Sequence, residues 1–347
     1  MKTHPLLEHA VAKGNPVIEG ETATFLWQGR AAPRLIDDLS DWETSPRKLE
    51  RVAPGLWFVT LTLPLNAYLE YAFIDSKTGE RLPDPLNPKR IWNGINAYNH
   101  YFYMPKGKPS PYADRNPAAA SGDVTRHEIP AGDFFATKTR TVYLYRPPVQ
   151  EAVPLLVVYD GADYLKRGKL NIIADNLIAR GRVRPFAMAL VPNGRQARTL
   201  EYACSDVTLG FLMEKVLPLA REHLNLSPFD GGAYGVLGAS LGGLMALYTG
   251  IRLPGVFGKV LSQSGAFRIA EHEFVLTELV CHLPRPALQV WMDVGRFEWL
   301  LACNQEMHAL LESKDYAVTY REFSGGHNYT SWRDDVARGL EMLFKNN

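Results

Sequence analysis

The amino-acid sequence predicts two domains of different class: an antiparallel β-sandwich, followed by an α/β domain with a doubly wound, mostly parallel sheet. Short β-type runs separated by turn residues fill the first hundred residues, as in small sandwiches. Later in the chain, apolar strands alternate with helical segments, as in βαβ units. The segment between, 105–122, is too rich in Pro, Gly and Ala to form a core, so we expect an ordered linker. The expected boundaries are 1–110 for the sandwich, 111–124 for the linker and 125–347 for the α/β domain.

The sandwich domain owes its prediction to three β-type runs, at 22–27, 56–63 and 68–75, with Pro- or Gly-containing turns beside them. It also holds four tryptophans, which either fill its core or form a platform on which sugars stack. Aromatic residues in a small sandwich usually belong to the core, and we favour that interpretation. The four are Trp27, Trp42, Trp57 and Trp92. The polar, Gly-containing segment 90–96 is a candidate loop over a cleft.

The α/β domain is predicted from short apolar runs that are typical of buried parallel strands. These runs lie at 155–159, 187–191, 234–237, 260–262 and 288–292. Functional groups in such sheets gather beyond the carboxyl ends of the strands. The search for a site therefore starts at the residues that directly follow each run.

The strongest local motif is Gly238-Ala239-Ser240-Leu241-Gly242, between a predicted strand at 233–237 and a predicted helix from 243. This strand–turn–helix context is that of a nucleophile elbow. The glycines permit a strained turn, which leaves the serine Oγ at the helix N-terminus, where unpaired N–H groups favour an oxyanion. We interpret Ser240 as a nucleophile rather than as part of a structural Gly-Ser turn.

A histidine and an acid should follow the nucleophile in the chain if this is an α/β-hydrolase. His327 follows two glycines just after a predicted strand at 318–323, and we expect it to be the base. Two acids follow the strand at 288–292. Asp293 lies at the strand end, where a capped turn or a salt bridge is the alternative role, and Glu298 lies beyond the turn at Gly295. We prefer Glu298 and keep Asp293 as the second candidate.

Composition excludes several other classes of function. The formal net charge of the 347 residues is +1, with no basic stripe, which argues against nucleic acid or an anionic membrane as a partner. The nine histidines and three cysteines contain neither H-E-x-x-H nor C-x-x-C, so we expect no metal and no cofactor. Cys204, Cys281 and Cys303 are interpreted as free thiols of a reducing compartment. With no apolar segment typical of a signal peptide or a membrane span, we expect a cytoplasmic protein.

Several blocks in this order resemble the putative-esterase family of α/β-hydrolases, which includes enterochelin (ferric enterobactin), feruloyl and acetyl-xylan esterases and S-formylglutathione hydrolases. The resemblance is greatest to the enterochelin esterases and covers most of 125–345. The blocks are 139–145 with 147–148, 159–161, Arg198 with Glu201 and Tyr202, 238–243, 257–265, Gly295 with Glu298, and 325–327 with Trp332. The first domain similarly resembles the early-set immunoglobulin-like domain of those esterases, through 41–42, 55–57, 68–71 and 84–88.

The resemblance implies acyl transfer by Ser240, His327 and Glu298, since the family's acid follows a Gly-x-x pattern that falls on Glu298. The oxyanion should bind the N–H of Leu241 and a second N–H from Ala162 or Gly161.

Candidate substrate contacts are Asp160, Arg195, Arg198 and Trp332. For Arg198 we favour an ion pair with Glu201 that shapes the loop, whereas Arg195 is a candidate clamp for an anionic substrate. A small-molecule siderophore ester is the favoured substrate. The alternatives are feruloyl or acetyl esters of oligosaccharides, and a non-catalytic carbohydrate-binding module.

Overall fold

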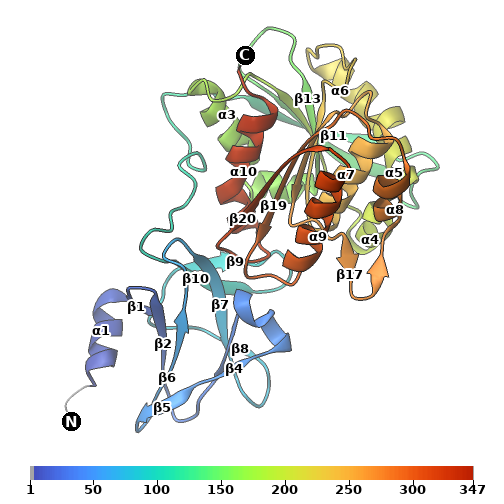
Figure 1. Ribbon diagram of the computed structural model, residues 1–347. Coiled ribbons are helices and arrows are strands. Elements are labelled where there is room, and N and C mark those ends of the chain that lie inside the picture. The colour runs from blue at the N-terminus through green and yellow to red at the C-terminus, as the bar shows by residue number, and fades with distance from the viewer. Residues whose placement is uncertain (1–3, 347) are drawn as a thin grey trace. The chain divides into compact units, whose positions relative to one another are not determined.

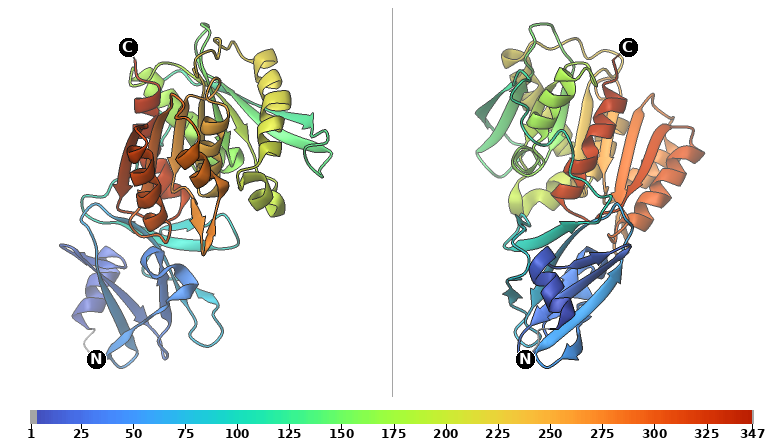
Figure 2. Two further views of the ribbon diagram at one scale, coloured as in Figure 1. Left: turned by 45° about the vertical axis from the view of Figure 1, so that its right-hand side comes forward. Right: turned by 90° about the vertical axis from the view of Figure 1, so that its left-hand side faces the viewer.

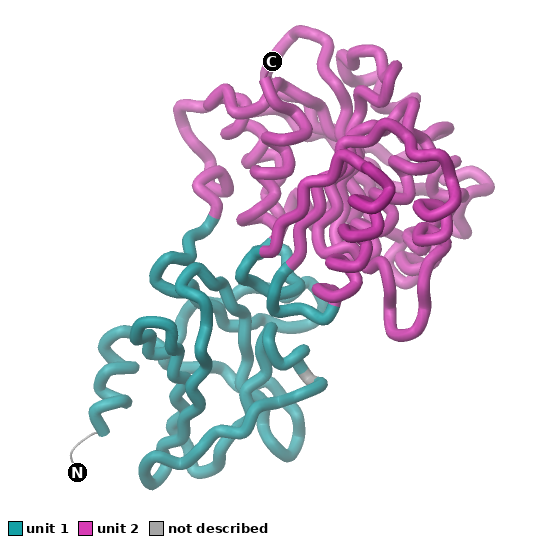
Figure 3. The backbone as a smooth tube through the Cα atoms, viewed as in Figure 1, with its two compact units in different colours: residues 1–109, 295–299, 323–331 teal, residues 110–294, 300–322, 332–347 magenta. Residues whose placement is uncertain are grey.

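The computed structural model describes residues 4–346 and divides the chain into two compact units (Figure 3). Unit 1 comprises 1–109, 295–299 and 323–331; unit 2 comprises 110–294, 300–322 and 332–347. The predicted domain boundaries stay a prediction, and the units divide the chain differently, because unit 1 includes two late segments. Residues 1–3 and 347, which the predicted domains include, lie outside the described residues.

Unit 1 is built around two antiparallel sheets, one with the strand order β1-β2-β6-β5 and the other with β4-β3-β7-β10-β9, where β8 pairs with β7 (Figure 1). A helix, α1 (Pro5–Lys13), precedes them. The strands are β1 (Val17–Glu19), β2 (Thr22–Gln28), β3 (Arg34–Asp37), β4 (Arg47–Lys48), β5 (Glu50–Ala53), β6 (Leu56–Thr62), β7 (Tyr68–Ile74), β8 (Arg81–Leu82), β9 (Arg90–Trp92) and β10 (Tyr98–Tyr103).

The two sheets of unit 1 share one core, which confirms the predicted sandwich. Phe25 of β2 packs edge-on against Tyr71 of β7 and Phe102 of β10. The predicted core role is correct for Trp27 and Trp57, which pack against this core. Of the other two tryptophans, Trp42 packs on a smaller cluster around Ile36, and Trp92 is 39% exposed.

Unit 2 contains an eight-stranded sheet with the order β11-β12-β14-β13-β15-β16-β19-β20 (Figures 1 and 2). The pairs from β14 to β19 are parallel, whereas β12 is antiparallel to both β11 and β14. This is the mostly parallel α/β-hydrolase sheet that the sequence predicts. The strands are β11 (Asp123–Pro130), β12 (Thr139–Arg146), β13 (Leu155–Tyr159), β14 (Ala187–Val191), β15 (Gly235–Ala239), β16 (Lys259–Gln263), β19 (Gln289–Gly295) and β20 (Ala317–Phe323); a small hairpin adds β17 (Arg268–Ile269) and β18 (His272–Glu273).

Helices cover both faces of this sheet (Figure 2). Val260 and Leu261 are neighbours on β16 and therefore point to opposite faces. Gly250 of α7 packs against Val260, and Gly339 of α10 packs against Leu261, so the sheet is doubly wound as predicted. The helices are α2 (Gly161–Lys166), α3 (Leu170–Ala179), α4 (Arg198–Tyr202), α5 (Asp206–Phe211), α6 (Leu217–His223), α7 (Leu241–Arg252), α8 (Val275–His282), α9 (Leu301–Ser313) and α10 (Tyr329–Leu343).

The segment 110–122 lies within unit 2 and is ordered there by hydrogen bonds to α3. The Asn176 amide donates to the carbonyls of Tyr112 and Asp114, and the Gly122 N–H donates to the Asp175 carboxylate. Across residues 4–346, the helices are too short or too polar for any of them to traverse a lipid bilayer.

Candidate active site

Ser240 occupies a strained turn between β15 and α7. Its φ of 60° and ψ of −126° are unusual for a residue with a side chain. Two backbone hydrogen bonds fix the turn: the Ser240 N–H donates to the Gln263 carbonyl (2.9 Å), and the Ser240 carbonyl accepts from Ala266 N–H (3.0 Å). Gly238 is required here, because a Cβ at this position would overlap the Gly242 backbone. The geometry is that of a nucleophile elbow.

The first turns of α2 and α7 lie beside each other at the carboxyl ends of β13 and β15, which are neighbouring parallel strands. A Cβ added to Gly242 would come within 3.2 Å of the Asp160 carboxylate, just before α2. First-turn N–H groups have no acceptor within their own helix. Gly161, Ala162 and Leu241 therefore carry N–H groups suited to an oxyanion, and that role stays a prediction.

A buried ion pair connects these two turns. Asp160 is 2% exposed, and its carboxylate accepts two hydrogen bonds from the Arg198 guanidinium, at 2.9 and 2.6 Å. The Asn193 amide donates to the same carboxylate (2.5 Å). Arg198 also donates to the carbonyl of Ala239, the residue before Ser240 (3.3 Å). Arg198 thus joins Asp160, the residue before α2, to Ala239, the residue before Ser240.

The predicted ion pair between Arg198 and Glu201 is wrong. Glu201 instead pairs with Arg140 of β12, and both side chains are almost fully buried. Glu201 also accepts from the Gly194 N–H (2.8 Å). The physical reason is burial: a desolvated carboxylate needs several donors in fixed positions, and here strand β12 and the loop after β14 supply them.

The other predicted substrate contacts are placed as follows. Asp160 is buried and engaged by Arg198, which favours a positioning role. Trp332 is 4% exposed, and its indole N–H donates to Ser264 Oγ (2.9 Å), inside unit 2. Arg195 is exposed, with a left-handed φ of 57°. Direct contact of these residues or of Arg198 with a substrate stays a prediction.

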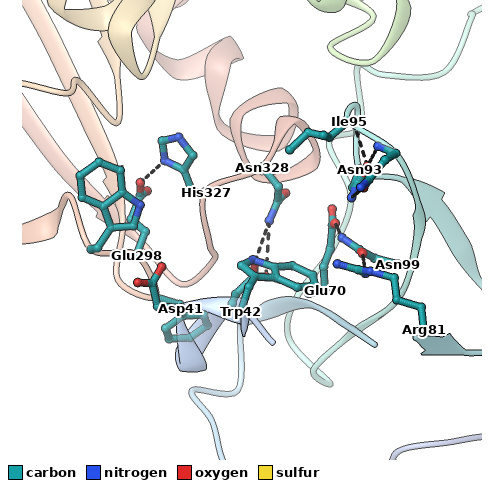
Figure 4. A pocket seen from close by; sticks show the side chains of 14 residues that line it. Asp41, Trp42, Glu70, Arg81, Asn93, Ile95, Asn99, Glu298, His327 and Asn328 are labelled. Atoms are coloured by element: carbon teal, nitrogen blue, oxygen red, sulfur yellow. Dashed lines mark hydrogen bonds and ion pairs between the residues drawn. The ribbon is translucent and has the colours of Figure 1, made fainter. Parts of the chain in front are cut away.

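His327 and Glu298 form a hydrogen bond within unit 1 (Figure 4). The Nδ1 atom of His327 lies 2.5 Å from Oε2 of Glu298, whose side chain is 1% exposed, whereas that of His327 is 26% exposed. The other oxygen of Glu298 accepts from the Gly295 N–H (2.7 Å). The carboxylate is therefore held from both sides, and it fixes the Nδ1 edge of the imidazole.

Asp293, the second candidate acid, has different partners. Its buried carboxylate accepts from the Trp291 indole (2.8 Å) and from the Gln263 amide. Burial, and to a lesser degree the neighbouring Asp335, raises the pKa of Asp293 well above its usual value. The contact with His327 thus belongs to Glu298.

A pocket of about 420 Å³ opens beside His327 and Glu298, and all of its lining residues belong to unit 1 (Figure 4). Aromatic side chains line part of it, including Trp42 and Trp299. Sequence reasoning missed most of this lining, because most of it comes from strands and turns of the sandwich that carry no catalytic motif. Two signals were present. The segment 90–96 was a candidate cleft loop, and Asn93, Ile95 and Asn96 line the pocket; Trp42, one of the tryptophans considered for a stacking platform, lines it too.

The chain is similar to known esterases in sequence and in fold. The family model described as "Putative esterase" matches residues 136–343. The iron(III) enterobactin esterase of Escherichia coli K12 is 25% identical over 342 residues, covering 87% of this chain and 83% of that protein. The ferric enterobactin esterase structure from Salmonella typhimurium has a TM-score of 0.81 at 22% identity over 93% of each chain.

The enterobactin esterase from Shigella flexneri, solved in the presence of enterobactin, has a TM-score of 0.75 at 22% identity, again over 93% of each chain. Both of these solved structures have the α/β-hydrolase fold and the β-rich N-terminal region that this chain has. Because the family model spans more than half of the chain, this protein belongs to the putative-esterase family and is a carboxylic ester hydrolase.

Proposed function

We propose that the protein is a serine esterase in which Ser240, His327 and Glu298 form the catalytic triad, and that it hydrolyses catecholate siderophore esters of the enterobactin type. The single observation that carries the triad is the His327–Glu298 hydrogen bond, formed by the residues expected to act as base and acid. The strained turn at Ser240 supports the nucleophile independently.

The mechanism follows from these groups. His327 Nε2 takes the proton of Ser240 Oγ as that oxygen attacks the ester carbonyl, and Glu298 holds the Nδ1–H tautomer and stabilises the imidazolium. The tetrahedral oxyanion would accept hydrogen bonds from the Leu241 N–H and from Ala162 or Gly161. Collapse breaks the C–O bond, and the alcohol leaves with the proton from His327. Water then repeats the cycle on the acyl-serine and releases the acid.

The substrate class rests on the relatives. Those from Escherichia coli, Salmonella typhimurium and Shigella flexneri are named for enterobactin, and their likeness covers nearly the whole chain, including the sandwich. A cytoplasmic location is part of this proposal. The free thiols of Cys204, Cys281 and Cys303 support it, because a reducing compartment keeps thiols unpaired.

The triad is tested with Ser240→Ala, using the exposed Ser313→Ala as the matched control. On a short-chain p-nitrophenyl ester, we expect Ser240→Ala to lose activity by at least about a thousandfold and Ser313→Ala to keep it. Equal rates in wild type and Ser240→Ala would contradict the proposal. The substrate is tested with an enterobactin-type trilactone set against feruloylated and acetylated oligosaccharides. Faster hydrolysis of the oligosaccharide esters would favour the sugar-esterase alternative.

A further inference from the structure

The pocket beside His327 carries more negative than positive groups. Four carboxyl groups and one guanidinium line it: Asp38, Asp41, Glu70, Glu298 and Arg81. Among the residues that the structure describes, the exposed Asp41 carboxylate has no ion-pair partner. Asp41 therefore adds to the pocket lining a negative charge that no ion pair with a described residue compensates.

The single guanidinium is already directed toward one of these acids. Arg81 donates to the Asn99 amide oxygen (2.5 Å), and the Asn99 NH₂ donates to Glu70 (2.7 Å). The guanidinium also lies over the Trp42 ring, 5.3 Å from its centroid. Because Arg81 is held in this series of hydrogen bonds, its positive charge offsets the negative charge of Glu70 more than it attracts a ligand.

Asp38 does not change this balance. Burial and the nearby Glu70 raise the pKa of Asp38 well above its usual value, which favours the neutral form of this carboxyl. With Asp38 neutral, the carboxylates of Asp41, Glu70 and Glu298 still outnumber Arg81. An anion entering the pocket meets net repulsion.

The remaining wall suits an uncharged aromatic group. Ile95, Phe297 and Trp299 offer apolar surface, and the ring of Trp299 lies 6.3 Å from that of His327. Asn96 and Asn328 add neutral polar groups. An aryl ring with amide or hydroxyl substituents matches this combination.

We propose that this pocket selects against anionic substrates, so that the enzyme hydrolyses the metal-free catecholate ester faster than its ferric complex. This inference rests on the proposed function. Each catechol loses two protons on binding iron(III), so a tris-catecholate complex is a trianion. The metal-free ester is largely uncharged at neutral pH.

The test compares kcat/KM for the metal-free trilactone, its germanium(IV) complex and its gallium(III) complex. The two complexes have similar shape but are a dianion and a trianion. We expect kcat/KM to be highest for the metal-free ester and lowest for the trianionic gallium complex, with a difference of at least about tenfold between these two. Added salt should reduce this difference, because salt screens charge. Asp41→Asn should lower the ratio of kcat/KM for the metal-free ester to kcat/KM for the gallium complex. The control Glu21→Gln, which changes an exposed acid outside the pocket, should leave that ratio unchanged. A gallium complex as fast as the metal-free ester at every salt concentration would overturn the inference.

A second substrate series separates this inference from the siderophore assignment. Butyrylcholine, 3,3-dimethylbutyl butyrate and 3-sulfopropyl butyrate are similar in size and are cationic, neutral and anionic. If no trilactone is hydrolysed but the anionic butyrate is the poorest of the three, the siderophore substrate is wrong and the pocket's selection against anions holds. If the anionic butyrate is the best of the three, that selection is refuted even when the trilactone is hydrolysed.

Discussion

The ion pair between Arg198 and Asp160 gives the sharpest test of how the active-site turns are held. In Arg198→Ala, the Asp160 carboxylate, which is 2% exposed in the wild type, loses both guanidinium hydrogen bonds. Breaking one side of a buried pair typically costs about 3–5 kcal/mol. The Arg198 side chain is itself 27% exposed, so water can replace part of the guanidinium. We therefore expect a loss of about 3 kcal/mol in the free energy of unfolding.

The same unit contains a matched control. Arg182 pairs with Glu341 in the same two-bond geometry, with both hydrogen bonds at 2.9 Å, but the Arg182 side chain is 55% exposed. Arg182→Ala should change stability little, because water and salt already weaken an exposed pair. Both pairs have two guanidinium–carboxylate hydrogen bonds and differ strongly in burial, and Arg198 in addition donates to the Ala239 carbonyl.

The assay is urea unfolding followed by circular dichroism, with p-nitrophenyl ester hydrolysis measured on each folded variant. Adding Asp160→Asn to Arg198→Ala should recover part of the lost stability, since the buried charge is then gone. Activity should fall in Arg198→Ala and not in Arg182→Ala, because only Arg198 contacts the carbonyl before Ser240. Equal, small losses of stability in both single variants would refute the reasoning.

Three further predictions concern single groups. Glu298→Gln should lower kcat by about 10³–10⁴-fold with a smaller change in KM, since the Nδ1–H tautomer of His327 loses its acceptor; unchanged kcat on a p-nitrophenyl ester would contradict it. Asp38 has a raised pKa in the native state, so its contribution to stability is greatest below its unfolded pKa of about 4 and declines as pH rises through the native value. Asp38→Asn should therefore gain stability relative to wild type between pH 5 and pH 8 in urea unfolding, and a relative loss would refute this. Burial raises the pKa of Cys204 to about 12. In a variant with Cys204 as its only cysteine, the alkylation rate of the folded protein should therefore rise about tenfold per pH unit up to pH 10, whereas the rate of the unfolded protein should level off near pH 9.

The sheet and the nucleophile elbow were predictable because their signals are local. Strands β13 and β14 are buried on both faces, so their sequences are continuous apolar runs. Gly238 and Gly242 mark a turn in which backbone meets backbone, and Ser240 is the one polar side chain in the motif. These features depend on residues that are close together in the chain, so the sequence alone indicates them.

The pairing of buried charges was not predictable in this way. Arg198 and Glu201 are three residues apart on α4, a spacing that commonly gives an ion pair. Arg198 instead pairs with Asp160, 38 positions away, and Glu201 pairs with Arg140, 61 positions away. Spacing along a helix ranks only local partners, whereas burial decides between partners that the sheet brings together.

The same limit applies to the loop that carries His327. In the sequence, Gly325-Gly326-His327 is a glycine-rich loop that follows a predicted strand of the α/β domain. In unit 1, a Cβ on Gly326 would overlap the Asp38 carboxyl, and the Tyr68 N–H donates to the Ser324 carbonyl (2.9 Å). Asp38 in turn accepts from the Glu70 N–H (2.8 Å). The glycine permits close approach to the sandwich turn at Asp38, so residues of the first hundred positions hold the loop that carries His327, the proposed base.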